Sequence, residues 1–275
     1  MDRIVREIRD MTYLSWAKIR NSSGTAGSFL KSYEEENGTK IYYKLSDYDA
    51  YRGIVGHECV NEIIVDRLLT LLGIEHLEYN LIHADILIDG KKYTTWLCAS
   101  EDFKKRGESK IALDAYYSRE RLSADESPLD FCIRCGWEKS IYEMLVVDYL
   151  ILNRDRHGAN IEVLRNASQR KLRLAPLFDH GLSLLCRCQD AEALEKENVM
   201  ADKPVQSFIG SRSAYENLKL IPSDKFPVLN SLKKSDKETV VGGLEEALDQ
   251  KWLDKIWDMI WERWQVYADF CGKRR

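Results

Sequence analysis

Two short stretches of the sequence place polar residues directly beside apolar ones. The first, NRDRHGANIEVL (153–164), follows an apolar run and contains Asp155 and Asn160 with four residues between them. The second, APLFDHGLSLL (175–185), sets Asp179 among apolar neighbours. An unpaired carboxylate next to a core is costly, so these positions are candidates for chemistry rather than for packing.

Phosphoryl transfer from ATP requires residue types of this kind. It needs a carboxylate that orients and deprotonates the attacking hydroxyl, oxygen ligands for Mg²⁺, and a lysine with backbone N–H groups on the phosphates. Asp155 and Asn160 have the spacing of the kinase pattern H-R-D-x-x-x-x-N, and Asp179 follows a short predicted hairpin, where D-F-G would lie. The order of these weak signals along the chain predicts a kinase.

The N-terminal hundred residues read as strands with one helix. A loop of small residues, SSGTAGS (22–28), separates the first strand from a hairpin that turns at Asn37-Gly38, and Asp89-Gly90 marks a second hairpin. Helical spacing of apolar residues ends at Gly73, a plausible helix cap. The expected strands are 12–20, 29–33, 39–45, 79–88 and 91–99, and the expected helix is 57–72.

Lysine candidates for the phosphate contact lie on the predicted hairpin after the small-residue loop. Lys44 is favoured because it lies in IYYKL on the last strand, while Lys31 and Lys40 are rivals. An acidic partner for Lys44 is expected on the following helix. Glu62 is the candidate, with Glu58 one turn earlier as the alternative.

The residues around Asp155 resemble a known family. DRHGANI (155–161) is similar to the D-R-H-x-x-N motif of HipA-type serine/threonine kinases and of phosphatidylinositol 3/4-kinases. Asn153 in front of this motif and LAPLFD (174–179) favour HipA, whose patterns are N-x-D-R-H-x-x-N and L-A-P-x-Y-D. Asn61-Glu62 resembles the αC-like helix of that family, and SEDF (100–103) resembles its hinge exit. The resemblance covers about residues 22 to 190 and is closest to compact stand-alone HipA-like kinases.

This resemblance and the chemistry together imply a role for each candidate residue. Asp155 is expected to be the catalytic base, with Arg156 and His157 shaping its loop. The expected Mg²⁺ ligands are Asn160 and Asp179. The expected ATP contacts are Lys44 with its partner Glu62, the glycine loop (Gly24, Thr25, Gly27), and the hinge (Cys98, Ala99, Ser100, Glu101).

The resemblance also implies a form of regulation. In HipA toxins a serine near the glycine loop is autophosphorylated, which expels the loop and inactivates the enzyme. This loop departs from the usual family sequence but carries four hydroxyls, so autophosphorylation is a hypothesis beside the plainer interpretation that they cap turns. The residues concerned are Ser22, Ser23, Thr25 and Ser28.

The expected architecture is an α+β, two-lobed kinase-like fold. Residues 1–100 would form an antiparallel N-lobe with one helix, and 101–275 a mainly helical C-lobe, with ATP and Mg²⁺ between them. Helices are expected at 128–135 and 139–152 and a hairpin at 161–175. A last helix at 251–271 carries an aromatic stripe that indicates core packing.

Composition limits the partners of the chain. Its 275 residues carry 41 lysines and arginines against 45 aspartates and glutamates, a net charge of −4, so no general attraction to nucleic acid or anionic membranes is expected. The apolar runs are about half of the ~20 residues that a membrane span needs. No secretory signal is apparent, and seven cysteines without a disulfide pattern favour a reduced, cytoplasmic protein.

Other interpretations of the chain remain open at this stage. The expected partners are a protein substrate with Ser or Thr and, by the resemblance, an antitoxin-like regulatory protein. A lipid or small-molecule kinase is one alternative, and a nucleotide-binding pseudokinase in a toxin–antitoxin module is another. Zinc at Cys132, Cys135, Cys186 and Cys188 is disfavoured because the second pair lacks the usual spacing.

Overall fold

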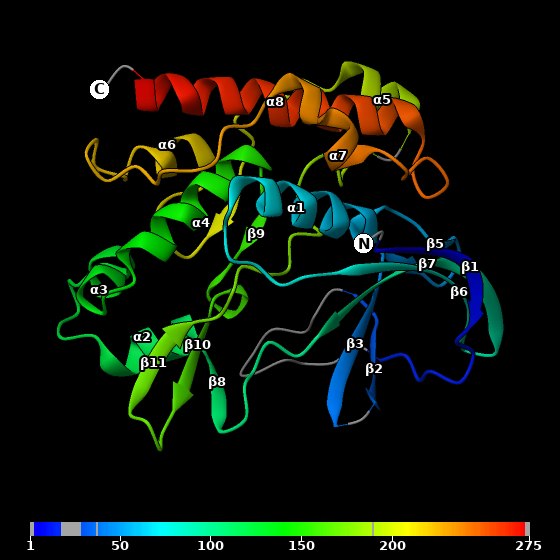
Figure 1. Cartoon of the computed structure of the whole chain (residues 1–275), viewed down its shortest axis with the longest axis horizontal. Helices are drawn as coiled ribbons and strands as arrows, with labels where there is room; N and C mark the ends of the chain where they lie inside the picture. Colours follow the sequence, from blue (N-terminus) through cyan, green and yellow to red (C-terminus); the bar gives the residue numbers. More distant parts are fainter. Residues whose placement is uncertain (1–2, 18–28, 37, 189, 273–275) are drawn as a thin grey trace.

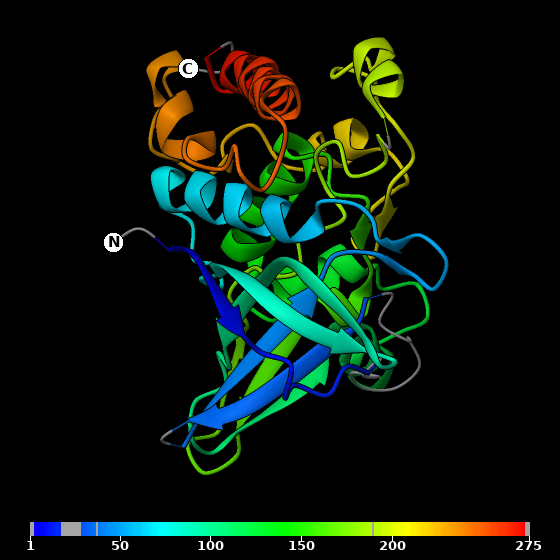
Figure 2. The ribbon, with the colours of Figure 1, turned by 90° about the vertical axis from the view of Figure 1, so that its right-hand side faces the viewer.

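The computed structural model describes residues 3–17, 29–36, 38–188 and 190–272. A sheet near the N-terminus and a helical C-terminal region make up the fold, with α1 between the sheet and the last helices (Figures 1 and 2). The expected α+β class is confirmed. The helices are α1 (Glu58–Leu72), α2 (Leu113–Glu120), α3 (Pro128–Arg134), α4 (Glu138–Leu150), α5 (Ala191–Lys196), α6 (Ala214–Leu218), α7 (Lys237–Val241) and α8 (Gln250–Gly272).

Within the described residues, the strands form one larger sheet and three small ones. The larger sheet has the order β1-β6-β7-β3-β2, and a second has the order β11-β10-β8. The strands are β1 (Ile4–Asp10), β2 (Lys31–Glu36), β3 (Thr39–Leu45), β4 (Tyr48–Asp49), β5 (Gly53–Ile54), β6 (Asn80–Ile88), β7 (Lys91–Glu101), β8 (Glu108–Ala112), β9 (Asp155–Arg156), β10 (Glu162–Asn166), β11 (Lys171–Leu174) and β12 (Gln206–Ser207).

Most predicted hairpins and helices are confirmed, but the first strand was placed wrongly. Of the predicted strand 12–20, residues 12–16 are irregular, Ala17 forms only an isolated bridge with Lys31, and residues 18–20 lie outside the described residues. The first strand is instead β1, which pairs with β6 in parallel, so the sheet is not wholly antiparallel. β1 shows no alternation of burial beyond Ile4, and an edge strand of this kind leaves little pattern in the sequence.

Helix α1 ends where the sequence indicated. Gly73 adopts the left-handed conformation, with φ of 76°, and its N–H closes the last turn on the carbonyl of Thr70. Glycine accepts this conformation without steric cost. The helix is buried over most of its surface, and its buried residues include the polar Glu58, Asn61 and Glu62. These side chains need partners inside the protein.

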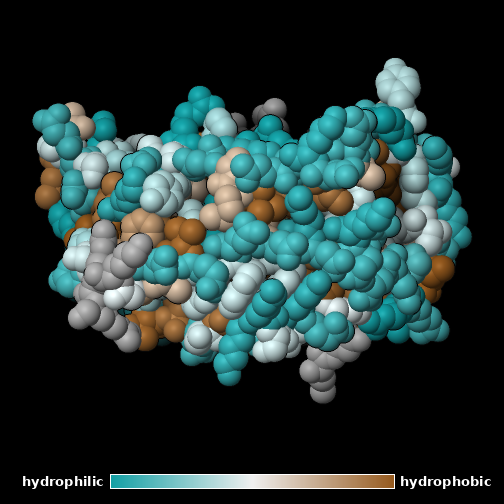
Figure 3. All heavy atoms as spheres, turned by 90° about the horizontal axis from the view of Figure 1, so that it is seen from above, coloured by the Kyte–Doolittle hydropathy of each residue, from teal (hydrophilic) through white to brown (hydrophobic). Residues whose placement is uncertain are grey.

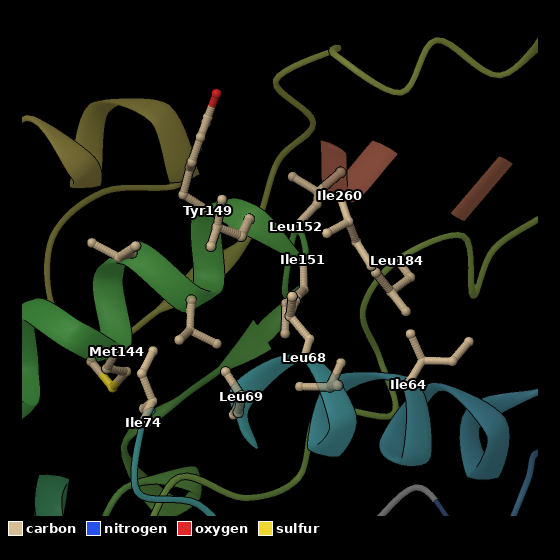
Figure 4. Packing of buried hydrophobic residues seen from close by; sticks show 14 of the residues in the cluster. Ile64, Leu68, Leu69, Ile74, Met144, Tyr149, Ile151, Leu152, Leu184 and Ile260 are labelled. Carbon is tan, nitrogen blue, oxygen red and sulfur yellow. The ribbon is translucent and has the colours of Figure 1, made fainter. Parts of the chain in front are cut away.

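One large apolar core joins α1 to the C-terminal helices. Ile64, Leu68 and Leu69 of α1 point toward side chains from the end of α4 and from α8 (Figure 4). The aromatic stripe of α8 is core, as predicted, since Trp257, Trp264 and Tyr267 are buried. A smaller apolar cluster lies within the N-terminal sheet.

The expected division at residue 100 falls within secondary structure. β7 continues through Glu101, which still pairs with Ile41 of β3. The assignment of 1–100 and 101–275 to separate lobes therefore stays a prediction.

The outer face that carries α8 is largely hydrophilic, and its apolar side chains form small separate areas (Figure 3). Among the described residues, none of the helices combines the length and the apolar character that crossing a membrane requires.

Truncation of Leu68 tests whether α1 is held by this core. Leu68 is fully buried, so Leu68→Ala is expected to lower the free energy of unfolding by about 2–5 kcal/mol in urea titrations. The matched control is Leu122→Ala, because Leu122 is 77% exposed and its loss should change stability by less than about 0.5 kcal/mol. Equal stability of the two variants would contradict the packing described here.

Candidate active site

Lys44 connects two acidic residues from different parts of the fold. It lies on β3, and its Nζ is 2.9 Å from Oε1 of Glu62 on α1 and also contacts the carboxylate of Asp179. Glu58 instead accepts a hydrogen bond from the backbone N–H of Asp47 at 3.1 Å. Of the two candidates on the helix, Glu62 is therefore the partner of Lys44.

Lys44 and Asp179 stabilise each other's charged forms inside the protein. Burial alone would lower the pKa of Lys44, but Asp179 and Glu62 hold it well above its usual value. Burial would likewise raise the pKa of Asp179, but the charge of Lys44, with that of Lys31, holds it well below its usual range. Lys44 and Asp179 are thus both charged at neutral pH.

The backbone around Asp179 is fixed by the same residues. Asp179 has a φ of 59°, a conformation that only a few per cent of non-glycine residues adopt and that aspartate tolerates better than most. Its N–H donates to the hydroxyl of Tyr79 at 3.2 Å, and the N–H of His180 donates to Oε2 of Glu62 at 2.9 Å. Burial lowers the pKa of the His180 ring well below its usual value, so the ring is neutral.

Gly181 allows Lys44 and Glu62 to approach the chain. A Cβ at this position would lie 3.2 Å from Nζ of Lys44 and 3.3 Å from Oε1 of Glu62. The carbonyl of Gly181 accepts a hydrogen bond from the side chain of Asn61 at 2.9 Å. The glycine of the Asp-His-Gly sequence therefore leaves space beside the buried Lys44 and Glu62.

Arg156 anchors the loop that carries Asp155. Its side chain is buried, and its Nε and Nη2 donate to the carboxylate of Asp148 on α4. Its Nη1 donates to the carbonyls of Asn160 at 3.2 Å and of Phe178 at 3.0 Å. One guanidinium thus ties α4 to both polar stretches of the sequence.

Asp155 is held by its neighbours in the loop. Its N–H donates to the side-chain oxygen of Asn153 at 3.3 Å, and its carbonyl accepts from the side chain of Asn160 at 2.8 Å. Burial raises the pKa of the Asp155 carboxyl; His157 opposes this rise and Asp179 adds to it. The ring of His157 lies 3.7 Å from that carboxylate and accepts a hydrogen bond from the N–H of Ala159.

Backbone hydrogen bonds join the two polar stretches. The N–H of Arg154 donates to the carbonyl of Leu182 at 2.9 Å, and the N–H of Leu184 donates to that of Ile151 at 2.7 Å. Leu184 and Leu152 both have positive φ angles, 54° and 47°. Such conformations cost free energy in leucine and persist only where the surrounding structure imposes them.

The oxygens at this site fit a magnesium ion better than a transition metal. Asn160 donates through its Nδ2, and its Oδ1 has no protein donor among the described residues. The carboxylate of Asp179 is a quarter exposed. Mg²⁺ is commonly held by one or two protein oxygens together with phosphates and waters, which matches this sparse set. Within the described ranges, no group of three or more His, Cys, Asp or Glu side chains is arranged to hold a metal.

The residues predicted to contact adenine divide into two pairs. Cys98 and Ala99 lie between two strands, because each has register partners on both β3 and β6. Their backbone groups therefore point to neighbouring strands. Ser100 and Glu101 have register partners on β3 alone. A backbone contact to adenine from this segment is therefore expected from the latter pair and the residues that follow, and the prediction for the side chains of Cys98 and Ala99 stays a prediction.

The glycine loop cannot be compared with its prediction. Gly24, Thr25 and Gly27, and the hydroxyl-bearing Ser22, Ser23 and Ser28, lie outside the described residues. The chain after the loop does reach the site, since the buried Phe29 ring lies 5.0 Å from Nζ of Lys44.

Several residues of the site were missed in the sequence. Asp148 was counted within an apolar run, although a single acidic residue in MLVVDYLIL was a signal that it has a buried partner. Tyr79 and Glu162 gave no such signal. Burial raises the pKa of the Glu162 carboxyl, and Lys110, Asp102 and Lys31 are the charged groups that act on it.

Neutralising Asp148 tests the anchoring role of Arg156. Asp148→Asn leaves the guanidinium buried without its counter-charge, so the free energy of unfolding should fall by about 3–5 kcal/mol. Chemical denaturation followed by circular dichroism measures this change. The control is Glu216→Gln, which removes an exposed ion pair with Lys219 and should not change stability measurably. A similar, negligible effect of both substitutions would show that Arg156 does not depend on Asp148.

Comparisons with known proteins identify solved structures that share this fold. No protein-family model matches the chain, and no curated protein matches it by sequence. Among solved structures, the Helicobacter pylori proinflammatory kinase CtkA is similar with a TM-score of 0.67 and 16% identity, over 97% of both chains.

A second similar structure is HipA of Shewanella oneidensis, solved in a complex with HipB and operator DNA. It has a TM-score of 0.54 and 14% identity, and the match covers 94% of this chain and 68% of that one. The resemblance found in DRHGANI is thus matched by the three-dimensional structure. The chain has a HipA-like kinase fold.

Proposed function

We propose that the chain is an ATP- and Mg²⁺-dependent kinase that transfers the γ-phosphoryl group to a Ser or Thr hydroxyl of a protein. The observation that carries this proposal is the buried contact of Lys44 with both Glu62 and Asp179. A lysine paired with a helical glutamate, next to a metal-binding aspartate, is the arrangement that phosphate binding requires in kinases.

The residues of the site have separate tasks in this reaction. Asp155 accepts a hydrogen bond from the attacking hydroxyl and takes its proton as the bond to phosphorus forms. Asn160 and Asp179 hold Mg²⁺, which neutralises charge on the phosphates when bound. Lys44 contacts the phosphates, and Ser100 and Glu101 present backbone groups to adenine. The loop of residues 22–28 is assigned the remaining phosphate contacts.

Regulation and partners form a further part of the proposal. Autophosphorylation at Ser22, Ser23, Thr25 or Ser28 is proposed from the sequence resemblance. An antitoxin-like partner is proposed because the HipA structure contains HipB. A cytoplasmic location rests on the seven free cysteines. A protein substrate is preferred to a lipid because neither a basic patch nor a membrane-binding segment stands out in the sequence.

Radiolabelled ATP and three substitutions test the assignment of the site. Asp155→Asn should keep Mg-ATP affinity but reduce phosphate incorporation by about 10²–10⁴-fold, because only the proton acceptor is lost. Lys44→Ala and Asp179→Ala should weaken nucleotide binding in calorimetric titrations, because each removes a contact to the phosphates or the metal.

Lys92→Ala is the control for Lys44→Ala. Lys92 lies on β7, is 60% exposed and forms an ion pair with Asp85, so its loss should leave nucleotide binding unchanged. Wild-type protein that binds Mg-ATP and labels neither itself nor any protein would refute the protein-kinase proposal. Unchanged binding in both site variants would refute the site.

The rate should fall on acidification because the base becomes protonated. Burial raises the pKa of Asp155, so phosphoryl transfer should be lost at a higher pH than for an ordinary aspartate. His157→Asn removes the ring that lies 3.7 Å from this carboxylate and opposes the rise of its pKa, while keeping a side chain that can cap the turn. The acid limb of the kcat/KM profile should therefore move to higher pH in this variant. A limb that stays in place, or moves to lower pH, would argue against Asp155 as the titrating base.

A further inference from the structure

Glu162 carries a buried carboxylate oxygen that no mechanism above uses. Its Oε2 is inaccessible to solvent and has no hydrogen-bond partner among the described residues. Leaving a buried acceptor unpaired costs free energy, more so when it is charged. Unsatisfied groups of this kind in native proteins call for an explanation, and a missing ligand is one.

The register of the second sheet shows which way this side chain faces. Glu162 and Leu164 of β10 are two residues apart and share a face, and Leu164 lies directly opposite Lys110 of β8. Nζ of Lys110 is 4.1 Å from the centre of the Phe103 ring and 5.8 Å from that of Tyr42. Glu162 is therefore on the face of this sheet that turns toward β3.

The facing surface of the N-terminal sheet is the one that carries Lys44. Tyr42 and Lys44 are two residues apart on β3 and so project from the same face. Lys31 of β2 pairs directly with Lys44 and shares this face as well. Glu162 and Lys44 thus belong to two sheets whose inner faces approach each other.

Glu162 lies between the adenine end and the metal end of the proposed nucleotide site. At one end Lys110 forms an ion pair with Asp102, just beyond the proposed adenine contacts of β7. At the other end lies Asn160, a proposed metal ligand, two residues before Glu162 on the chain, whereas Leu164, opposite Lys110, lies two residues after it. In a nucleotide, the group between base and phosphates is the ribose.

We propose that Glu162 accepts hydrogen bonds from the ribose hydroxyls of the bound nucleotide. This inference rests on the proposed function and adds a residue that determines nucleotide specificity. A carboxylate at this place repels phosphates and can only accept hydrogen bonds, whereas ribose offers two neighbouring donors. Binding gives the orphaned oxygen the partner that the free protein does not provide.

Binding of ADP and of 2′,3′-dideoxy-ADP, both with Mg²⁺, tests this proposal by isothermal titration calorimetry. Wild-type protein should bind ADP about ten- to a hundredfold more tightly, as expected for hydrogen bonds to a charged acceptor. Glu162→Gln should reduce this ratio, and Glu162→Ala should bring it close to one. Affinity for the dideoxy nucleotide should stay near the wild-type value in both variants.

Glu143→Gln is the matched control. Glu143 is another partly buried glutamate whose pKa is raised by burial, but it lies on α4 and pairs with Lys139. In Glu143→Gln, the ratio of the affinities for ADP and dideoxy-ADP should equal that of the wild type. The isosteric Glu162→Gln should also have an unchanged or higher melting temperature without nucleotide, because the oxygen that it alters has no partner there.

The outcomes separate the two proposals. Equal wild-type affinity for ADP and dideoxy-ADP, or discrimination that persists in Glu162→Ala, overturns the role of Glu162 and leaves the kinase proposal standing. Wild-type protein that binds neither nucleotide overturns the kinase proposal and this inference with it. A lower melting temperature of Glu162→Gln together with unchanged discrimination assigns the residue to structure alone and overturns the inference.

Discussion

The guanidinium of Arg156 lies inside the protein, and each of its three nitrogens has an acceptor there. A charge in that position is tolerated only with its counter-charge and its full set of hydrogen bonds. Those partners are the carboxylate of Asp148 and the carbonyls of Asn160 and Phe178. The need to satisfy one cation therefore fixes α4, the loop of Asp155 and the backbone before Asp179 relative to one another. The hydrogen bonds between 151–154 and 182–184 continue this connection.

A second buried cation connects this assembly to the N-terminal sheet. Lys44 comes from β3, Glu62 from α1 and Asp179 from the C-terminal region. Helix α1 holds the apolar core with some of its side chains and the site with others, so the position of Glu62 follows from the packing of Leu68 and its neighbours. Rigid elements carry the charged groups, and this is what precise placement of reacting groups requires.

Much of this arrangement was predictable because it depends on local patterns. The spacing of Asp155 and Asn160, the period of α1 and the glycine that ends it are all read from neighbouring residues. The position of β1 was not predictable, since a mostly exposed edge strand shows little alternation of apolar and polar residues and its parallel partner β6 is distant in sequence. Asp148 and Tyr79 were missed for a related reason: their roles arise from contacts that only the folded chain creates. The backbone of Cys98 and Ala99 was predicted to be open to a ligand because the sequence does not tell which strands flank β7.

The contact between Lys44 and Asp179 has a consequence for how a ligand enters. In the free protein these residues act as counterions for each other, which keeps the site electrically balanced without any bound group. If the chain binds nucleotide and Mg²⁺ as proposed, the polyanion would pair with Lys44 and the divalent cation with Asp179, so that one internal ion pair would be exchanged for two external ones. Because these charges are already buried in the free protein, a large part of the desolvation cost would have been met during folding. The free site would thus already hold, as the ion pair of Lys44 and Asp179, the two charges that the ligand contacts.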